Sequence, residues 1–199
     1  MSTKNKKKIK LDKRDIAIIS IINRDNRINL SKIAKELNVS HVSIGLRLNK
    51  LLKNKIIDIK VRINPKILNI NLGFILLEIE TSSYNKLLKI YKQCPRVIGV
   101  FDLIGEYNLG VFFFAENPDT FKTILKFCML YSFPSIRKST ILTIGDHYFP
   151  SFVNIRLSKF IKNNIPCNSN CNTCDAFLNN KCLGCPNFIH YKGNLKIEI

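Results

Sequence analysis

The sequence has no long apolar run, and this shortage excludes whole classes of protein. No apolar stretch reaches the roughly 18 residues that a membrane-spanning helix needs, because Asp102 and Glu106 interrupt the best candidate. The basic start followed by IAIISII is not a signal peptide either, since Asp12 and Asp15 interrupt it and no small-residue cleavage site follows. We therefore expect a cytoplasmic protein with no membrane partner.

Catalytic groups are also scarce. The chain has three histidines, His41, His147 and His190, and none belongs to a paired acid–base cluster. We therefore expect no enzyme activity and no catalytic residues.

Acidic residues are few, and the resulting positive charge is concentrated at one end. The 199 residues include 32 Lys and Arg against 14 Asp and Glu, a net charge of +18. Residues 1–62 contain 17 basic and 5 acidic residues, so they account for 17 − 5 = +12 of that total. This asymmetry indicates that the N-terminal part contacts a polyanion. The alternative is a basic N-terminal tail, residues 1–10, without consequence.

Residues 11–63 have the pattern of a helix-turn-helix domain. Asp12, Asn29 and Ser40 are each placed to cap a helix, and Asn38 falls where a sharp turn needs a left-handed residue. The inward-facing residues recur at helical spacing: Ile16, Ile19 and Ile22, then Ile33, Ala34 and Leu37, then Ile44, Leu48 and Leu51. Two or three residues between the second and third helices match a helix-turn-helix, whose second helix enters the major groove of DNA.

The third helix and the segment after it contain the candidate DNA contacts. IIDIKVRI, residues 56–63, is predicted to form a strand or small wing. Polar and basic side chains on these elements can reach base edges or phosphates: Ser40, His41, Ser43, Arg47, Asn49, Lys50, Lys60 and Arg62. The alternatives are a solvated helix face and, for Arg47, an internal salt bridge.

Residues 64–150 have the pattern of a ferredoxin-like domain. Strands are predicted at LGFILLEIE, VIGVFDL, LGVFFFA and STILTI, and helices at SSYNKLLKIYKQC and NPDTFKTILKFCML. Asn117 is expected to cap the second helix, with Pro118 as its first residue. The βαββαβ order predicts an antiparallel sheet with two helices on one face. Cys94 and Cys128 fall on the apolar helix faces, so both are predicted core residues.

These two domains together resemble the Lrp/AsnC family of transcription regulators. The resemblance is carried by LDKRDIAIISIINRDNRINLSKIAKELNVS, by Arg47, Leu48 and Leu51, by IIDIKVRINP and by the βαββαβ order. It covers about residues 11 to 150. It implies an α+β protein with an N-terminal winged helix-turn-helix and a ferredoxin-like effector domain, which binds double-stranded DNA as a homodimer or higher homo-oligomer.

The resemblance also implies a small-molecule effector, usually an amino acid, bound where the domains meet. The segment GEYN aligns with the family's Gly-x-Tyr-Asp turn, so the effector-binding candidates are Gly105, Tyr107 and Asn108. A simple hairpin turn is the alternative. Asn108 departs from the family's acid. Lys55 departs from the glycine that usually ends the recognition helix, and we expect the preceding Asn54 to take the left-handed cap.

Residues 151–199 form a cysteine-rich module with the spacing C-x3-C-x2-C-x7-C-x2-C. Reduced thiols are the default in the cytoplasm, so the spacing indicates a metal site with the ligands Cys167, Cys171, Cys174, Cys182 and Cys185. The run C-x3-C-x2-C favours a 4Fe–4S cluster, with Cys182 or Cys185 as the fourth ligand. Zinc held by the two C-x2-C pairs is the alternative; disulfides or free thiols remain open. The module is too small for a core of its own, so we expect metal to fold it.

The sequence therefore predicts a DNA-binding transcription regulator whose cysteine site has a structural or sensing role. Two alternatives keep the same architecture. One is an enzyme similar to siroheme decarboxylases, whose YNL strand resembles EYNLGVFFF, although no histidine stands just upstream of it. The other is a metal-carrying scaffold or electron carrier that does not bind DNA.

Overall fold

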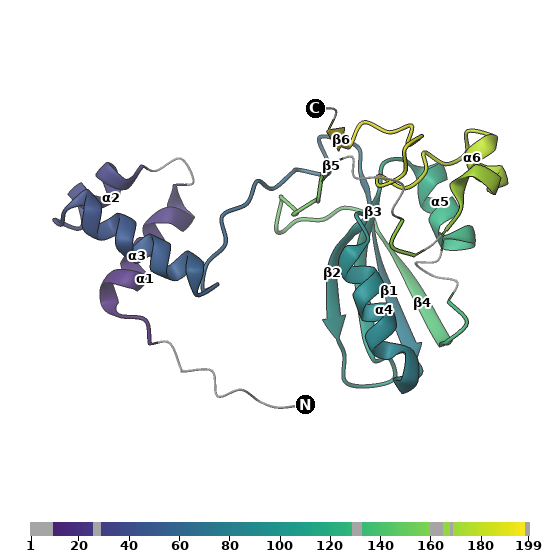
Figure 1. Cartoon of the computed structure of the whole chain (residues 1–199), viewed down its shortest axis with the longest axis horizontal. Helices are drawn as coiled ribbons and strands as arrows, with labels where there is room; N and C mark the ends of the chain where they lie inside the picture. The colour runs from purple at the N-terminus through teal and green to yellow at the C-terminus, as the bar shows by residue number, and fades with distance from the viewer. Residues whose placement is uncertain (1–9, 26–28, 129–132, 160–164, 168, 198–199) are drawn as a thin grey trace. The chain divides into compact units, whose positions relative to one another are not determined.

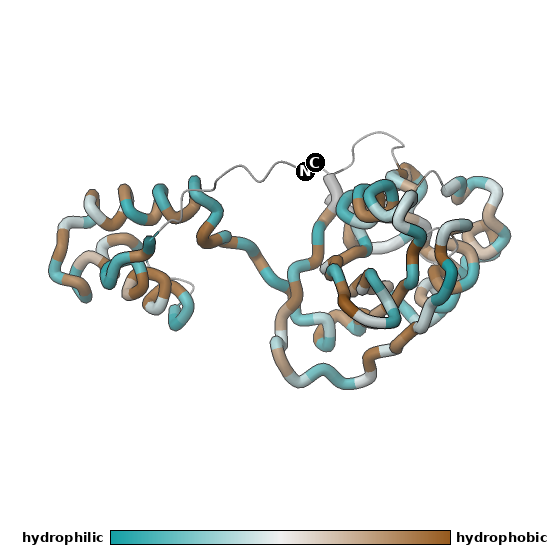
Figure 2. The backbone as a smooth tube through the Cα atoms, turned by 90° about the horizontal axis from the view of Figure 1, so that it is seen from below, coloured by the Kyte–Doolittle hydropathy of each residue, from teal (hydrophilic) through white to brown (hydrophobic). Residues whose placement is uncertain are grey.

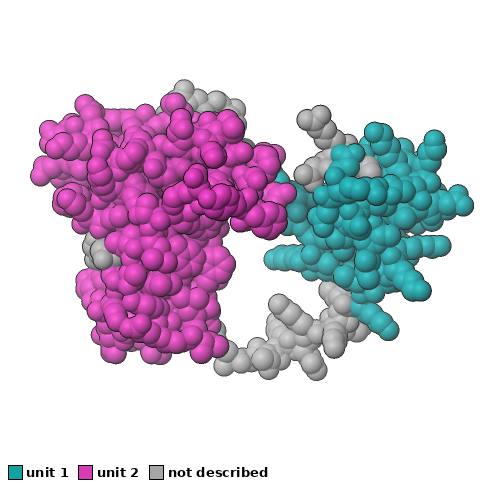
Figure 3. Space-filling model, turned by 180° about the vertical axis from the view of Figure 1, so that it is seen from behind, with its two compact units in different colours: residues 1–60 teal, residues 61–199 magenta. Residues whose placement is uncertain are grey.

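The chain forms two compact units, Met1–Lys60 and Val61–Ile199. Figure 3 colours them separately. The computed structural model describes residues 10–25, 29–128, 133–159, 165–167 and 169–197. Of the basic tail predicted at residues 1–10, all but the last residue lies outside the described residues.

The first unit consists of three helices, α1 (Lys13–Arg24), α2 (Leu30–Glu36) and α3 (His41–Lys53) (Figure 1). The predicted caps are confirmed, because the side chains of Asp12, Asn29 and Ser40 each accept a hydrogen bond from a backbone N–H in the first turn of their helix. Asn38, in the turn between α2 and α3, has φ +51° as the turn requires. Hydrophobic and hydrophilic residues alternate along these helices (Figure 2).

The core of this unit corrects the predicted face of α1. Ile18 and Ile21 are buried, whereas Ile16 is 56% exposed. The prediction was wrong for Ile16 and missed Ile18 and Ile21, whereas Ile19 and Ile22 do pack against this core. Asp15 is buried on the same face as Ile18. The rest of the core comes from α2 and α3: Ile33, Ala34, Ile44 and Leu51.

Two further predictions about the end of this unit were wrong. Lys55 itself adopts the left-handed conformation, with φ +55°, while Asn54 caps α3 with φ −81° and donates its side-chain amide to the Lys50 carbonyl at 2.7 Å. No strand forms within residues 56–62, all of which the structure describes. Only Ile63 makes a bridge, to Val153. Without a neighbouring strand the segment stays extended and solvated, and Val61 is 85% exposed.

The second unit contains a four-stranded antiparallel sheet. Its strands are β1 (Asn71–Ile79), β2 (Val97–Asp102), β3 (Leu109–Ala115) and β4 (Ile136–Ile144), in the order β2-β3-β1-β4. Helices α4 (Thr81–Gln93) and α5 (Pro118–Phe127) lie on one face of this sheet (Figure 1). Asn117 caps α5 as predicted. The α+β fold class with a ferredoxin-like domain is confirmed.

Alternate residues of the strands face the helices and form the main core. Ile75, Leu77, Val111 and Phe113 are fully buried there, together with Tyr91 of α4. The other face of the sheet is covered in part by the segments before β1 and after β4, which bury Leu72, Phe114, Val153 and Ile155. The remainder of that face carries partly exposed apolar side chains: Phe74, Phe101, Phe112 and Leu142.

The C-terminal residues add short elements to this domain. A single turn of 3-10 helix spans Cys171–Thr173, α6 spans Asp175–Leu178, and β5 (Ser158–Lys159) pairs in parallel with β6 (Lys196–Ile197). Among the C-terminal residues that the structure describes, Ile165, Phe177 and Phe188 form a buried apolar cluster. No helix among the described residues is long and apolar enough to cross a bilayer.

Candidate DNA-binding face and cysteine site

The recognition helix α3 presents polar side chains to solvent. Ser40, His41, Asn49 and Lys50 are exposed, and Ser43 is half-buried. The Ser40 hydroxyl accepts a hydrogen bond from the Ser43 N–H at 3.2 Å, so this side chain also holds the start of the helix. His41, Asn49 and Lys50 therefore remain the most accessible candidate contacts on α3.

Arg47 lies in an internal ion pair, which is the alternative considered from the sequence. Its guanidinium donates to Asp12 at 2.6 Å and to Asp15 at 2.8 Å, and the Asp15 side chain is only 6% exposed. The hydrogen bond from Arg47 lowers the pKa of Asp12 below its ordinary value of 3.8. Arg47 thus joins α3 to the start of α1, and its role as a DNA contact stays a prediction.

The two basic residues predicted beyond α3 are both exposed. The Lys60 ammonium forms an ion pair with Asp58 at 2.5 Å. Arg62 follows on the same extended segment. Neither stands on a wing strand, so their contact with phosphates stays a prediction.

The polar side chains of the predicted effector turn form hydrogen bonds with other residues of the ferredoxin-like domain. The Asn108 amide accepts from the Ile79 N–H at 2.9 Å and donates to the Ile79 carbonyl at 2.7 Å. The Tyr107 hydroxyl bonds to Thr140 at 2.6 Å. Gly105 has φ +144°, a conformation that favours glycine. Asn108 therefore ties β1 to the turn, and an effector role for these three residues stays a prediction.

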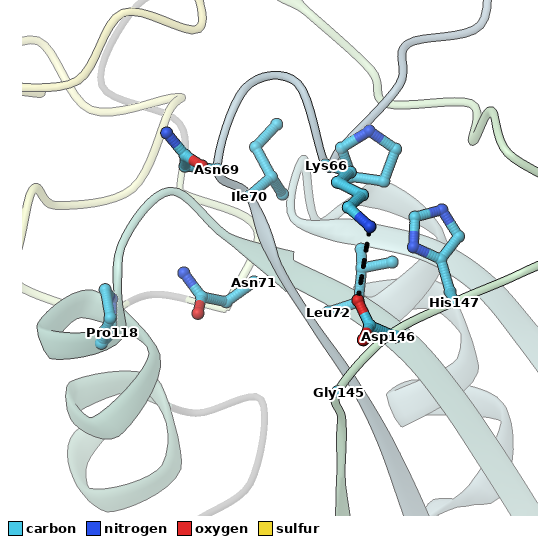
Figure 4. A pocket seen from close by; sticks show the side chains of 10 residues that line it. Lys66, Asn69, Ile70, Asn71, Leu72, Pro118, Gly145, Asp146 and His147 are labelled. Atoms are coloured by element: carbon cyan, nitrogen blue, oxygen red, sulfur yellow. Dashed lines mark ion pairs between the residues drawn. The ribbon is translucent and has the colours of Figure 1, made fainter.

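A separate pocket of about 340 Å³ lies beside the start of β1 and the end of β4. Figure 4 shows the Lys66 and Asp146 side chains pointing toward one another across it, with 3.6 Å between ammonium and carboxylate. Nε2 of His147 is buried, with no hydrogen-bond partner among the residues that the structure describes. Gly105, Tyr107 and Asn108 do not line this pocket.

All seven cysteines of the chain line one cavity of about 450 Å³. Five come from the C-terminal module, whereas Cys94 caps the end of α4 and Cys128 caps the end of α5. Both predicted core residues do pack in the main core. None of the seven, all of them described, is in a disulfide.

A buried ion pair holds the module on the ferredoxin-like domain. Arg96, 3% exposed, pairs with Glu116 and donates to the carbonyl of Gly184, which lies between two module cysteines. Glu116 also accepts from the Tyr191 hydroxyl. Burial acts to lower the pKa of Arg96, but the Glu116 carboxylate raises it above its ordinary value. Arg96 is therefore charged, and its guanidinium group lies beside the cysteines.

Two threonines of α5 extend this attachment. The backbone N–H of Leu183 donates to the Thr120 hydroxyl at 3.1 Å, and Thr123 donates to the Lys181 carbonyl at 3.2 Å. The module residues around Cys182 are thus fixed against α5 through their backbone.

The thiols experience different environments inside the cavity. A hydrogen bond with the Cys128 thiol lowers the pKa of Cys167 to about 6. Burial raises the pKa of Cys185 to about 12 and that of Cys94 to about 11, and it also raises the pKa values of Cys171 and Cys182. Cys167 is therefore the thiol best suited to be a thiolate near neutral pH.

The residues present fit a thiolate-ligated metal group in chemistry and in space. Soft thiolates bind zinc and iron–sulfur clusters, and the apolar shell formed by Phe177 and Phe188 shields the cavity. The cavity of about 450 Å³ has room for a single ion or for a cluster, and thiolates bind either. Among the described residues, however, no three Cys, His, Asp or Glu side chains already stand together as a metal-binding group. The five-cysteine ligand set therefore stays a prediction.

Solved structures share the two-domain part of this fold. AsnC of E. coli matches with a TM-score of 0.62 at 20% identity, covering 70% of this chain and 95% of that chain. A Neisseria meningitidis transcriptional regulator solved in complex with L-Met matches with a TM-score of 0.61 at 19% identity, covering 69% of this chain and 91% of that one. No protein-family model matches the chain.

Curated relatives decide the family. An uncharacterised HTH-type transcriptional regulator of Pyrococcus abyssi is 30% identical over 118 residues, which are 58% of this chain and 80% of the relative. The chain belongs to the HTH-type transcriptional regulators, and its two-domain part has the fold of AsnC. The regulator FL11 of Pyrococcus furiosus is 26% identical over 117 residues, 58% of this chain and 78% of FL11.

The chain is therefore a DNA-binding transcription regulator. Each of the four matches leaves at least 30% of the chain without a counterpart. The comparisons consequently inform the two domains and do not test the cysteine site.

Sequence reasoning missed Arg96, Glu116 and Cys128 as parts of the site. The signal for the first two was present, because each is a charged residue at the border of an otherwise apolar strand segment, in RVIGV and FFFAE. Their pairing across the strands could not be read from local periodicity. Cys128 stood on an apolar helix stripe and matched the pattern of a core residue.

We predict that Arg47→Met loosens the first unit and that this effect fades in acid. Asp12 has a lower pKa in the folded than in the unfolded chain, so its contribution to stability is present above pH 3.8 and is lost as the pH falls through the folded pKa. Amide hydrogen exchange of α1 and α3 should be faster in the variant at pH 7, and the difference from wild type should shrink below about pH 4.

Arg24→Met is the matched control, because it removes an exposed pair with Glu36 whose side chains are 68% and 43% exposed. We expect a smaller change, since exposed pairs contribute about 0–1 kcal/mol. Equal exchange in wild type and Arg47→Met at pH 7 would contradict the structural role of Arg47.

Proposed function

We propose that this regulator binds a two-fold symmetric operator as a homodimer, with one α3 helix of each protomer in the major groove. The observation that supports this most is the capped, polar α3 with His41, Asn49 and Lys50 exposed on a domain of net positive charge. Phosphate contacts by lysine supply affinity, whereas polar groups near the start of the helix read base edges. Two-fold symmetry sets the half-sites about one helical turn apart.

The outer face of the sheet supports the dimer. Phe74 stacks on Phe101 with 5.8 Å between ring centroids and lies 6.4 Å from Phe112. Leu142, opposite Phe74 on β4, is 48% exposed. A partly exposed apolar face of this kind is stabilised when a second copy covers it. The arrangement fits the face-to-face pairing that the family resemblance implied.

We predict that Lys50→Ala weakens binding to a duplex from the regulator's own promoter and flattens its salt dependence. Each lost lysine–phosphate contact lowers the slope of log K against log salt by about 1. Fluorescence anisotropy on the promoter duplex and on a random duplex, across a salt series, measures both quantities.

Two variants control this experiment. Lys89→Ala removes the same charge from an exposed position of α4 and should leave the slope unchanged. Arg47→Met should weaken binding by loosening α3 but leave the slope unchanged, because its guanidinium is paired with Asp12 and Asp15. Equal binding of promoter and random duplex by the wild-type chain would overturn operator recognition.

We predict that Leu142→Glu breaks the dimer. A carboxylate on the outer face must be desolvated without a partner when the sheets pack, so the dimer dissociation constant should rise about 100-fold or more. Analytical ultracentrifugation measures it. Thr143→Glu is the matched control, since the next residue of the strand faces the other side of the sheet and is exposed. Dimers of unchanged strength in Leu142→Glu would place the interface elsewhere.

We also propose that the cysteine site binds a 4Fe–4S cluster, with zinc as the alternative metal. The spacing of the five module cysteines, their shared cavity and the buried Arg96 support this assignment. In the metal-free chain, burial raises the pKa of Cys185 and so disfavours its thiolate. A bound cluster would hold the thiolates together and shield their charge. Gain or loss of the group would then order or release the module, which gives the site its sensing role.

We predict that Cys174→Ser loses most of the metal while the ferredoxin-like domain stays dimeric. The chain would be purified without oxygen and analysed for iron, acid-labile sulfide and zinc, together with its absorption spectrum. Thr173→Ala, in the same turn but without a thiol, should keep the wild-type metal content. A metal content that Cys174→Ser leaves unchanged would refute Cys174 as a ligand.

A further inference from the structure

The cysteine cavity is built by the ferredoxin-like domain as much as by the module. Lys86, Ile90 and Cys94 line it from α4, spaced four residues apart and so on one helix face. From α5 it is lined by a second set of neighbouring residues that includes Phe127 and Cys128. The cavity is therefore a groove between the two helices, closed by the C-terminal segment.

Cys128 and Cys94 enter this groove in different ways. Cys128 is partly exposed, and its thiol is hydrogen-bonded to the thiol of Cys167, the first cysteine of the module motif. Cys94 is 9% exposed, and its sulfur accepts a hydrogen bond from the backbone N–H of Arg96. Cys128 therefore contacts the motif directly, whereas the Cys94 sulfur is hydrogen-bonded to the nearby backbone.

We propose that Cys128 is a ligand of the metal site, beside Cys167, so that metal binding links α5 to the C-terminal module. This inference rests on the thiolate site proposed above and adds to it a ligand outside the motif. Cys128 and Cys167 line the same cavity, so both can reach one metal centre there, as tetrahedral thiolate sites bring their sulfurs together around a bond length of about 2.3 Å.

The surroundings of Cys128 favour this role. Its backbone N–H closes the last turn of α5 on the Ile124 carbonyl at 3.2 Å, and Ile124 is buried in the main core. On the module side, the bonds from Leu183 to Thr120 and from Thr123 to Lys181 hold the facing chain. Cys128 is thus fixed by α5, and the part of the module around Cys182 that lines the same cavity is fixed against α5; pre-organised ligands lower the entropic cost of binding.

With Cys128 as a ligand, metal binding acts on the ferredoxin-like domain itself. A metal bond to Cys128 would fix the C-terminal end of α5, whose Phe121 packs on Phe113 of the sheet. In a site built from the motif alone, loading would reach α5 only through the hydrogen bonds of Thr120 and Thr123 and would not fix its last turn. The two arrangements therefore differ in what α5 does when metal binds.

Cobalt(II) titration of the reduced full-length chain tests the proposal, because the intensity of thiolate-to-cobalt charge-transfer absorption reports the number of thiolate ligands. Cys128→Ser should bind cobalt at least tenfold more weakly and lose about a quarter of the absorption per cobalt, as one of four sulfurs is replaced. Cys94→Ser, the matched control at the end of α4, should titrate like wild type. A Cys128→Ser titration equal to wild type overturns the proposal.

A second measurement uses the wild-type chain and needs no folded variant. Cobalt loading should protect Cys128 and Cys167 together from alkylation by iodoacetamide and slow amide exchange in the last turn of α5, both read by peptide mass spectrometry. Protection of the module cysteines with Cys128 still reacting at its metal-free rate overturns the proposal and leaves the motif site standing. Absence of any cobalt–thiolate absorption in the wild type removes the proposed metal site and, with it, this inference.

Discussion

The buried ion pair between Arg96 and Glu116 is the contact on which the arrangement of the cysteine site depends. Charges inside a protein are costly unless they are paired and hydrogen-bonded, and here the Gly184 carbonyl and the Tyr191 hydroxyl complete the pair. Removing one partner of such a pair typically costs about 3–5 kcal/mol, because the other charge is left buried. The module's own apolar cluster has three buried residues and could not hold the chain in place alone. The ferredoxin-like domain therefore sets the position of the module's cysteines.

The first unit uses an arginine in a similar way. Arg47 joins α3 to Asp12 and the buried Asp15 of the α1 end, so the angle between these helices depends on charge as well as on isoleucine packing. A helix that reads DNA must keep a fixed orientation on its domain, because a displaced helix loses its contacts with base edges. Arg47 thus holds α3 in place from the side of α1, while Lys50 and His41 are exposed on the proposed DNA-binding face.

Local features were predictable from the sequence, and long-range ones were not. Asp12, Ser40 and Asn117 act within three residues of the helix they cap, so their chemistry is visible in a short window. Strand alternation gave the sheet in the same way. The contact between Cys128 and Cys167 spans 39 positions and depends on how the module folds back over α5. The wing strand was wrongly predicted for the same reason, because a strand forms only where another segment pairs with it. Within residues 56–63, Ile63 alone has such a partner, Val153.

The cysteine cavity and the proposed dimer face lie on opposite sides of one sheet, and this limits how a signal could pass between them. Phe113 of β3 packs under α5, with 5.2 Å between its ring centroid and that of Phe121. Phe112, the residue before Phe113 on β3, faces the outer side of the sheet near Phe74. Because neighbouring residues of a strand point to opposite faces, a shift of α5 transmitted to β3 would move both side chains at once. A metal that bound only the C-terminal segment would act on α5 indirectly, through Thr120 and Thr123, whereas a ligand at the end of α5 connects the site directly to the helix that packs on this strand.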